Sequence, residues 1–300
     1  MNWNTFTGTR WPRLLALTAS LLAGTSAHAQ SASESTFSSK LLLTGGVSNI
    51  EGSAGGGLTP WAVIGGYGTK EQVGGNAFYT NVRATDYTLN VAGVLVGIND
   101  RVELSFAQQK FDTRSVGGAL GLGNGYTFTQ KVVGAKVKLV GDAVLEQDSW
   151  LPQIALGVQR KENDRGALLR ALGIKSDKGT DIYLAATKLY LNQSLLLNGT
   201  VRFTKANQTG ILGFGTATKD SYRAQLEGSA ALLLRRDLAI GAEFRRKPDK
   251  LGFKEDDWYD VFIAYAPTKN VSLTLAWVDL GNIVIKDKQK ATYLSLQVGF

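Results

Sequence analysis

The feature that most constrains this 300-residue chain is an alternation of apolar and polar side chains with a period of two residues. The last ten residues, ATYLSLQVGF, show it most clearly, because every second side chain from residue 294 onward is apolar. These apolar positions are Leu294, Leu296, Val298 and Phe300. Stretches of about ten residues with this alternation, separated by turn-rich segments, are typical of transmembrane β-strands.

The alternation predicts about twelve strands. We expect them over residues 58–68, 82–98, 101–111, 126–140, 151–160, 181–191, 195–203, 222–234, 238–245, 259–265, 271–277 and 291–300. The connectors alternate between short and long, with residues 141–150 as the one longer member of the short set. Because outer-membrane barrels have short periplasmic turns and longer external loops, the sequence predicts an all-β transmembrane antiparallel β-barrel with up-and-down connectivity, over residues 58–300.

Hydropathy supports this fold class. Hydrophobic residues make up 44% of the chain, yet the mean hydropathy is only −0.06, so the apolar residues are spread out rather than bunched. Beyond the N-terminus no run of 18 apolar residues occurs, which excludes a membrane-spanning helix. A membrane protein without such helices needs a closed barrel to satisfy its backbone groups in lipid.

The first 29 residues have the organisation of a signal peptide. Arg10 and Arg13 form a basic region, and the apolar stretch LLALTASLLA follows at residues 14–23. Ala27 and Ala29 are the small residues that signal peptidase reads, so we expect cleavage after Ala29 and export through the inner membrane. The single histidine, His28, would be removed with this segment.

The composition argues against catalysis. The chain has no Cys and the processed protein would have no His, so thiolate metal sites and the usual base for a serine nucleophile are both missing. Asp256, Asp257 and Asp260 form the one close acidic cluster, which we interpret as a solvated loop end rather than a glycosidase pair. The glycine clusters at 55–57 and 121–125 lack the strand-to-helix context of a phosphate loop. We therefore predict no enzyme activity, cofactor or metal.

The formal net charge of +8 falls by two when Arg10 and Arg13 are removed. The basic residues are scattered, without the compact patch and interleaved aromatics that nucleic-acid binding requires. Scattered Lys and Arg suit a surface in contact with anionic lipopolysaccharide. The expected partners are therefore outer-membrane lipid and lipopolysaccharide.

Two segments carry a resemblance to known proteins. The terminal Phe300, which closes the face of Leu294, Leu296 and Val298, resembles the signal that the barrel-assembly machinery recognises, and this implies assembly by that machinery. The stretch LLLTGGVSNIEGSAGGGLTPWAVIGGYGT, residues 41–69, resembles the opening of an uncharacterised family of proteobacterial outer-membrane β-barrel proteins, a domain of unknown function. That family supplies no catalytic or binding residues.

The polar faces of the strands predict a lumen lined by both signs of charge. The lining residues are Glu103, Lys136, Lys138, Lys188, Asn198, Arg202, Arg223, Gln225, Glu227, Glu243, Arg245 and Asp260. A pore that selects one ion class would show a ring of one sign. Two interpretations stay open: opposite charges pair and fill a narrow interior, or the mixed lining surrounds a small water-filled channel.

These features favour a passive channel or facilitator for a small polar solute. The alternatives are a non-transporting barrel with a structural or surface-interaction role and, third, a lipid-active enzyme. Residues 30–57 are rich in Ser and Gly, and we hypothesise that residues 41–57 form a plug in the lumen or pack under the barrel mouth, so that deleting them raises conductance. In one long connector, residues 164–172 predict a short helix with Asp164 as N-cap and Gly173 at its end.

Overall fold

The computed structural model describes residues 40–253 and 255–300. The predicted signal segment, with its cleavage positions Ala27 and Ala29, lies outside the described residues. No helix in the described part of the chain is long and apolar enough to cross a membrane.

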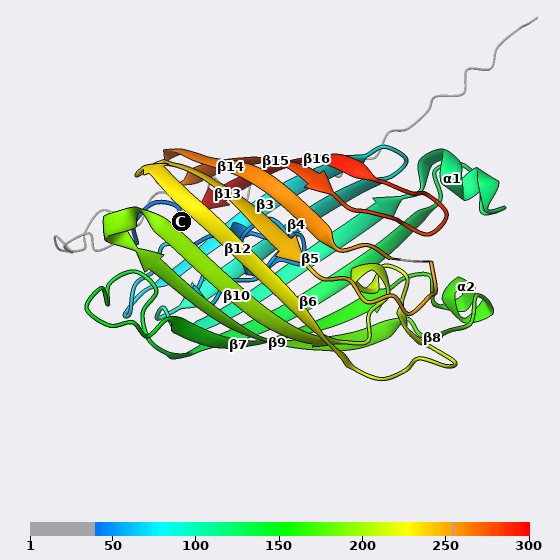
Figure 1. The fold of residues 1–300 in the computed structure, drawn as a ribbon, viewed down its shortest axis with the longest axis horizontal. Coiled ribbons are helices and arrows are strands. Elements are labelled where there is room, and N and C mark those ends of the chain that lie inside the picture. Colours follow the sequence, from blue (N-terminus) through cyan, green and yellow to red (C-terminus); the bar gives the residue numbers. More distant parts are fainter. Residues whose placement is uncertain (1–39, 254) are drawn as a thin grey trace, which may run out of the picture. The chain divides into compact units, whose positions relative to one another are not determined.

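Twelve antiparallel strands form one closed barrel in which each strand pairs with its neighbours along the chain (Figure 1). The strands are β3 (Val73–Ala84), β4 (Thr88–Ile98), β5 (Val102–Asp112), β6 (Thr127–Val140), β7 (Gln153–Asn163), β9 (Lys178–Tyr190), β10 (Leu195–Thr204), β12 (Arg223–Arg235), β13 (Leu238–Arg245), β14 (Trp258–Thr268), β15 (Val271–Asp279) and β16 (Lys290–Gly299). The barrel closes where β16 pairs with β3, from Ala291 opposite Ala84 to Gly299 opposite Asn76. The predicted transmembrane antiparallel barrel is confirmed.

The two faces of the strands differ as the alternation requires. Along β16 exposed and buried residues alternate without interruption. Leu294 is 52% exposed, whereas its neighbours Tyr293 and Ser295 are buried. The same holds for β15, where Leu275 and Trp277 are exposed on the outer face. Apolar side chains that are exposed on the outside of a closed barrel form the surface that meets lipid.

The predicted first strand over residues 58–68 is wrong, and the predicted strand over residues 82–98 is two strands joined by a turn. The first barrel strand is β3, which begins at Val73, and β4 follows it. The two errors offset each other, so the count of twelve holds. The inward face of this hairpin is largely apolar, with Phe78, Val82, Val91 and Leu95 all buried, so the alternation that marks the other strands is obscured here.

Short elements lie in the connectors and in the segment that precedes β3. They are β1 (Val47–Ser48), β2 (Ala54–Gly55), α1 (Arg114–Ala119), α2 (Gly166–Ala171), β8 (Ile174–Ser176), η1 (Leu191–Gln193), η2 (Gln208–Gly210) and β11 (Phe214–Thr216). The predicted helix is present as α2 and ends before Gly173, whose φ is +80°. Its predicted N-cap is wrong, because the carboxylate of Asp164 accepts a hydrogen bond from the backbone N–H of Thr129 and Arg165 occupies the cap position.

Candidate functional site

The barrel interior is occupied by the chain itself. Every residue from 47 to 65, which we call the interior segment, is buried, and the segment is drawn in blue in Figure 1. Its backbone N–H groups donate to inward-facing side chains on separate strands. Those of Ser48, Ala54 and Leu58 reach Gln297 on β16, Glu103 on β5 and Glu243 on β13, respectively. The interior segment is therefore held from several sides of the wall.

Glu51 is the electrostatic centre of the interior segment, and its side chain is fully buried. Its Oε1 lies 2.5 Å from Nζ of Lys161 and 2.8 Å from Nη2 of Arg245. Its Oε2 lies 3.0 Å from Nη2 of Arg202. These three cations come from β7, β13 and β10, so one carboxylate ties the interior segment to three strands.

Two further carboxylates complete this cluster. Asp181 lies 2.7 Å from Lys161, and Glu227 lies 2.5 Å from Arg202. Three anions therefore face three cations in the barrel interior. Charges removed from water are tolerated when each is paired and hydrogen-bonded, and removing one partner leaves another uncompensated. The cluster thus depends on the interior segment for one third of its negative charge.

Glu243 forms a second attachment. Its carboxylate accepts hydrogen bonds from the backbone N–H of Leu58 at 2.8 Å, from Oγ1 of Thr59 at 2.5 Å and from Oγ of Ser229 at 2.9 Å. The chain passes so close that a Cβ at Gly56 would lie 2.1 Å from Oε1 of Glu243. A larger residue at this position would displace the Glu243 carboxylate from its hydrogen bonds.

The third attachment is the Glu103–Lys136 ion pair, whose charged atoms lie 2.9 Å apart across β5 and β6. Glu103 accepts hydrogen bonds from the backbone N–H groups of Ala54 and Gly65. Lys136 donates to the carbonyl oxygens of Ala54 and Trp61. Both charges therefore bind backbone of the interior segment as well as each other.

Nine of the twelve predicted lining residues are buried in the interior. They are Glu103, Lys136, Asn198, Arg202, Gln225, Glu227, Glu243, Arg245 and Asp260. Asn198 donates to the carbonyl of Pro60 at 3.3 Å, so it also contacts the interior segment. Within the described residues, one carboxylate oxygen of Asp260 and the side-chain carbonyl of Gln225 have no hydrogen-bond partner.

The other three predicted lining residues lie elsewhere. Lys138 is half-buried at the end of β6, 2.5 Å from Asp100. Arg223 begins β12 and is exposed. The placement of Lys188 is a correction, because it shares the outer face of β9 with exposed Leu184.

Lys188 is buried on that outer face because the 141–152 connector covers it. Its ammonium group donates to the backbone carbonyls of Glu146 and Leu151. A lysine can lie on an apolar face when its charged end reaches polar atoms at the edge. The rule that charged residues point inward therefore fails at this position.

Sequence reasoning missed Glu51, Lys161 and Asp181. The predicted strand ended at residue 160, which put Lys161 in a loop, although it shares its parity with inward-facing Gln159. Glu51 had a signal of its own, because it is the one charged residue in the Gly-rich stretch from 41 to 69. A lone acid in an uncharged segment that precedes a barrel indicates a buried partner of opposite charge.

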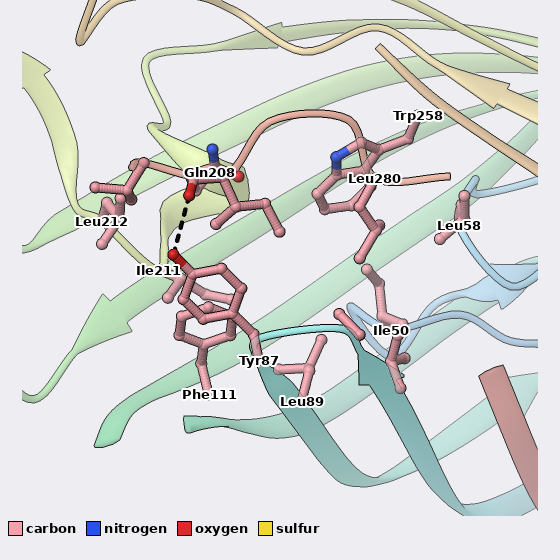
Figure 2. Close-up of a pocket in the computed structure, with 14 residues that line it drawn as sticks. Ile50, Leu58, Tyr87, Leu89, Phe111, Gln208, Ile211, Leu212, Trp258 and Leu280 are labelled. Carbon is pink, nitrogen blue, oxygen red and sulfur yellow. Dashed lines mark hydrogen bonds between the residues drawn. The ribbon is translucent and has the colours of Figure 1, made fainter. Parts of the chain in front are cut away.

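An apolar cavity borders the interior segment. Its volume is about 50 Å³, and Figure 2 shows Ile50 and Leu58 of the interior segment pointing toward it. Tyr87 and Phe111 stack with ring centres 5.1 Å apart, and the Tyr87 hydroxyl donates to the carbonyl of Ile283. Among the described residues no group of three or more His, Cys, Asp or Glu side chains is placed to hold a metal ion.

The solved structures that match this chain include three outer-membrane proteins. The outer membrane channel COG4313 from Pseudomonas putida F1 is 12% identical, with 81% of this chain and 97% of that chain covered and a TM-score of 0.51. The KdgM porin is 13% identical, with 75% and 99% covered and a TM-score of 0.49. The outer membrane phospholipase A from Escherichia coli is 10% identical, with 78% and 94% covered and a TM-score of 0.42. At such identities the likeness shows the fold alone.

No curated protein matches the chain. A family profile does match, over residues 44–297, and the family is described as "Protein of unknown function (DUF3034)". The match includes the interior segment together with nearly the whole barrel. It confirms the resemblance predicted from residues 41–69. The chain therefore belongs to the DUF3034 family.

Proposed function

We propose that this protein is an outer-membrane facilitator in which the interior segment is a plug, and that a small solute passes when the plug shifts. The observation that carries the proposal is the attachment of residues 47–65 to several walls of the barrel through Glu51, Glu243 and Glu103. These contacts are hydrogen bonds and ion pairs, which water can replace when the segment shifts. A plugged interior favours the first of the two interpretations left open by the sequence, in which opposite charges pair and fill a narrow interior.

Plug movement would change what the interior offers to a solute. The side chains that now bind the segment, such as Arg202, Arg245 and Glu243, would then be hydrated and line a passage of mixed charge. Such a lining suits a small polar or charged solute better than a large apolar one. This supports the polar solute expected from the sequence.

A disulfide lock tests whether the plug has to move. The chain has no Cys, and Oγ1 of Thr59 lies 2.6 Å from Oγ of Ser229, so two cysteines at these positions would be within bonding reach. Under oxidising conditions we expect the Thr59→Cys/Ser229→Cys variant in liposomes to lose at least tenfold in solute flux, and a reductant to restore it. Each single-cysteine variant is a control, and its solute flux should not change when the oxidant is added. Equal flux in the oxidised and reduced double variant would overturn plug movement.

A second variant tests the plug without a crosslink. Glu51→Gln leaves Lys161, Arg202 and Arg245 facing one another with less compensation, so we expect conductance in planar bilayers to rise severalfold. Glu162→Gln, the same change at an exposed residue of β7, should behave like the wild type. Heat-modifiable migration on a gel verifies that each barrel is folded. If neither the wild type nor Glu51→Gln passes any ion or small solute, the protein is instead the non-transporting surface barrel.

We also propose outer-membrane location and export by a cleaved signal peptide. The apolar outer face of the barrel supports the location, and Ala27 and Ala29 support the cleavage. Assembly by the barrel-assembly machinery through Phe300 and contact with lipopolysaccharide belong to the same proposal. N-terminal sequencing of protein from the outer-membrane fraction should begin at Gln30, and an intact Met1 would contradict it.

A further inference from the structure

A second, larger cavity lies among the long loops at the end of the barrel where α1 and α2 are found. Its volume is about 620 Å³, within the range of about 300–1,000 Å³ that is usual for small-molecule sites. Segments far apart in the sequence build its wall, and most of the wall is apolar. Representative lining residues are Phe128, Leu169, Ile174, Leu251 and Phe253.

Lys250 is the one charged residue among the described residues that line this cavity. Its side chain is largely buried, and its Nζ donates to the carbonyl oxygens of Ser221 at 2.9 Å and Thr204 at 3.5 Å. Lys250 forms no ion pair within the described part of the chain. Lys247, three residues earlier, differs because it pairs with Glu255 at 2.6 Å.

The surroundings of Lys250 disfavour its positive charge. Burial, together with the nearby cations Lys205 and Arg223, lowers the pKa of Lys250 to about 8, while Asp220 and Asp181 act in the opposite direction. At neutral pH the ammonium group remains mostly protonated. A buried cation without an anionic partner is costly, and a carboxylate would compensate it through charge-assisted hydrogen bonds.

We propose that this cavity binds a small organic acid with an apolar body, whose carboxylate pairs with Lys250. The inference rests on the proposed function, since it names the class of solute that the plugged barrel takes up. One cation in an otherwise uncharged wall fits a monocarboxylate. The remaining wall fits an aromatic or aliphatic body.

The position of the cavity connects it to the plug. It shares Tyr87, Phe111, Leu212 and Val284 with the smaller cavity of Figure 2. That smaller cavity reaches Ile50 and Leu58 of the interior segment. An acid held at Lys250 therefore lies in a cavity adjacent to the one that contacts the plug.

The test compares 4-phenylbutyrate with its uncharged amide, 4-phenylbutyramide, by calorimetry on full-length protein in zwitterionic nanodiscs. We expect the acid to bind the wild type at least tenfold more tightly than the amide. Lys250→Met, which keeps much of the side-chain length without the charge, should remove the preference while amide binding stays unchanged. Lys219→Met, at an exposed lysine of a neighbouring loop, should keep the preference for the acid. Equal binding of acid and amide to the wild type, or a preference that survives Lys250→Met, overturns the inference.

The outcome is separable from that of the proposed function, because binding is measured without flux. The oxidised Thr59→Cys/Ser229→Cys protein should still prefer the acid, since Lys250 lies outside the interior segment. Binding of the acid without flux in any variant would refute the facilitator and leave this site standing. Flux of small solutes without any preference for the acid would support the facilitator and refute this site.

Discussion

Nη2 of Arg245 lies 2.8 Å from Oε1 of Glu51, although 194 residues separate the two in the sequence. The same guanidinium donates through Nη1 to the carbonyl of Leu58, so Arg245 holds both an acidic side chain and the backbone of the interior segment. Arg245 of β13 therefore holds the interior segment at two positions. A substitution of Arg245 therefore tests the attachment of the interior segment more stringently than a substitution of a residue that contacts the segment once.

Replacing Arg245 by Met should therefore destabilise the folded protein. The change removes a cation from a balanced buried cluster and leaves the Leu58 carbonyl without its donor. We expect the free energy of unfolding to fall by about 3 kcal/mol, the size of loss typical when one partner of a buried pair is removed. Urea unfolding in detergent micelles measures it.

Arg235→Met is the matched control for this variant. Arg235 is an exposed arginine that pairs with Asp237 in the β12–β13 turn. An exposed pair contributes only about 0–1 kcal/mol, so this variant should unfold close to the wild type. Equal losses in the two variants would mean that the interior network does not hold the plug.

Gly55 and Gly199 give a prediction about close packing of the plug. A Cβ at Gly55 would lie 2.0 Å from the carbonyl oxygen of Thr59 and 2.9 Å from Cα of Pro60, whereas a Cβ at Gly199 meets nothing within 4 Å. Gly55→Ala should cost about 1–3 kcal/mol through overpacking and should speed hydrogen exchange in residues 47–59. Gly199→Ala should leave both unchanged. If hydrogen exchange in residues 47–59 of Gly55→Ala is as slow as in the wild type, the turn at Gly55 is less tightly packed than these distances indicate.

The outer face of β15 offers a test of the membrane location. Leu275 is exposed in the middle of the strand and has no polar atoms to satisfy. Leu275→Arg should lower barrel stability by about 2–4 kcal/mol, as expected for a charge near the bilayer midplane. Leu145→Arg, in the 141–152 connector, should cost little because Leu145 is 74% exposed outside the strands. Reversible folding into lipid vesicles under denaturant measures both, and equal stability of the two variants would contradict a lipid-facing β15.

The alternation of side chains predicts the ten barrel strands from β5 to β16 to within a few residues, because a strand in lipid needs an apolar outer face whatever the interior holds. It fails at β3 and β4 for a physical reason: Phe78 and Val91 belong to the buried apolar cluster that includes the interior segment, so both faces of these strands carry apolar residues. The same signal misled the assignment of residues 58–68. An enclosed segment buries Leu58 and Val63 much as a strand would.

The candidate site was less accessible from the sequence. The polarity of Arg202 and Glu243 predicts an inward position, but nothing in the alternation says that they bind Glu51 and Thr59. Such contacts depend on how the chain folds back through the barrel, over separations of more than a hundred residues. Lys188 shows the other limit, since a connector can bury a charge on the outer face.

The pH dependence of ligand binding follows from Lys250. Burial, together with Lys205 and Arg223, lowers the pKa of Lys250 to about 8, so the ammonium group is charged below that pH and neutral above it. An organic acid is ionised above a pH of roughly 4 to 5. Affinity for 4-phenylbutyrate should therefore be highest at intermediate pH and fall as pH rises through about 8, with the midpoint moved upward by the bound anion. Asp220 and Asp181 act on the pKa of Lys250 in the opposite direction, but the net shift is downward, so the sign of the effect is unchanged. Calorimetric titrations from pH 6 to pH 10 measure the effect, and Lys250→Met should give a flat profile. If the wild-type profile is flat as well, Lys250 is not the group that holds the carboxylate.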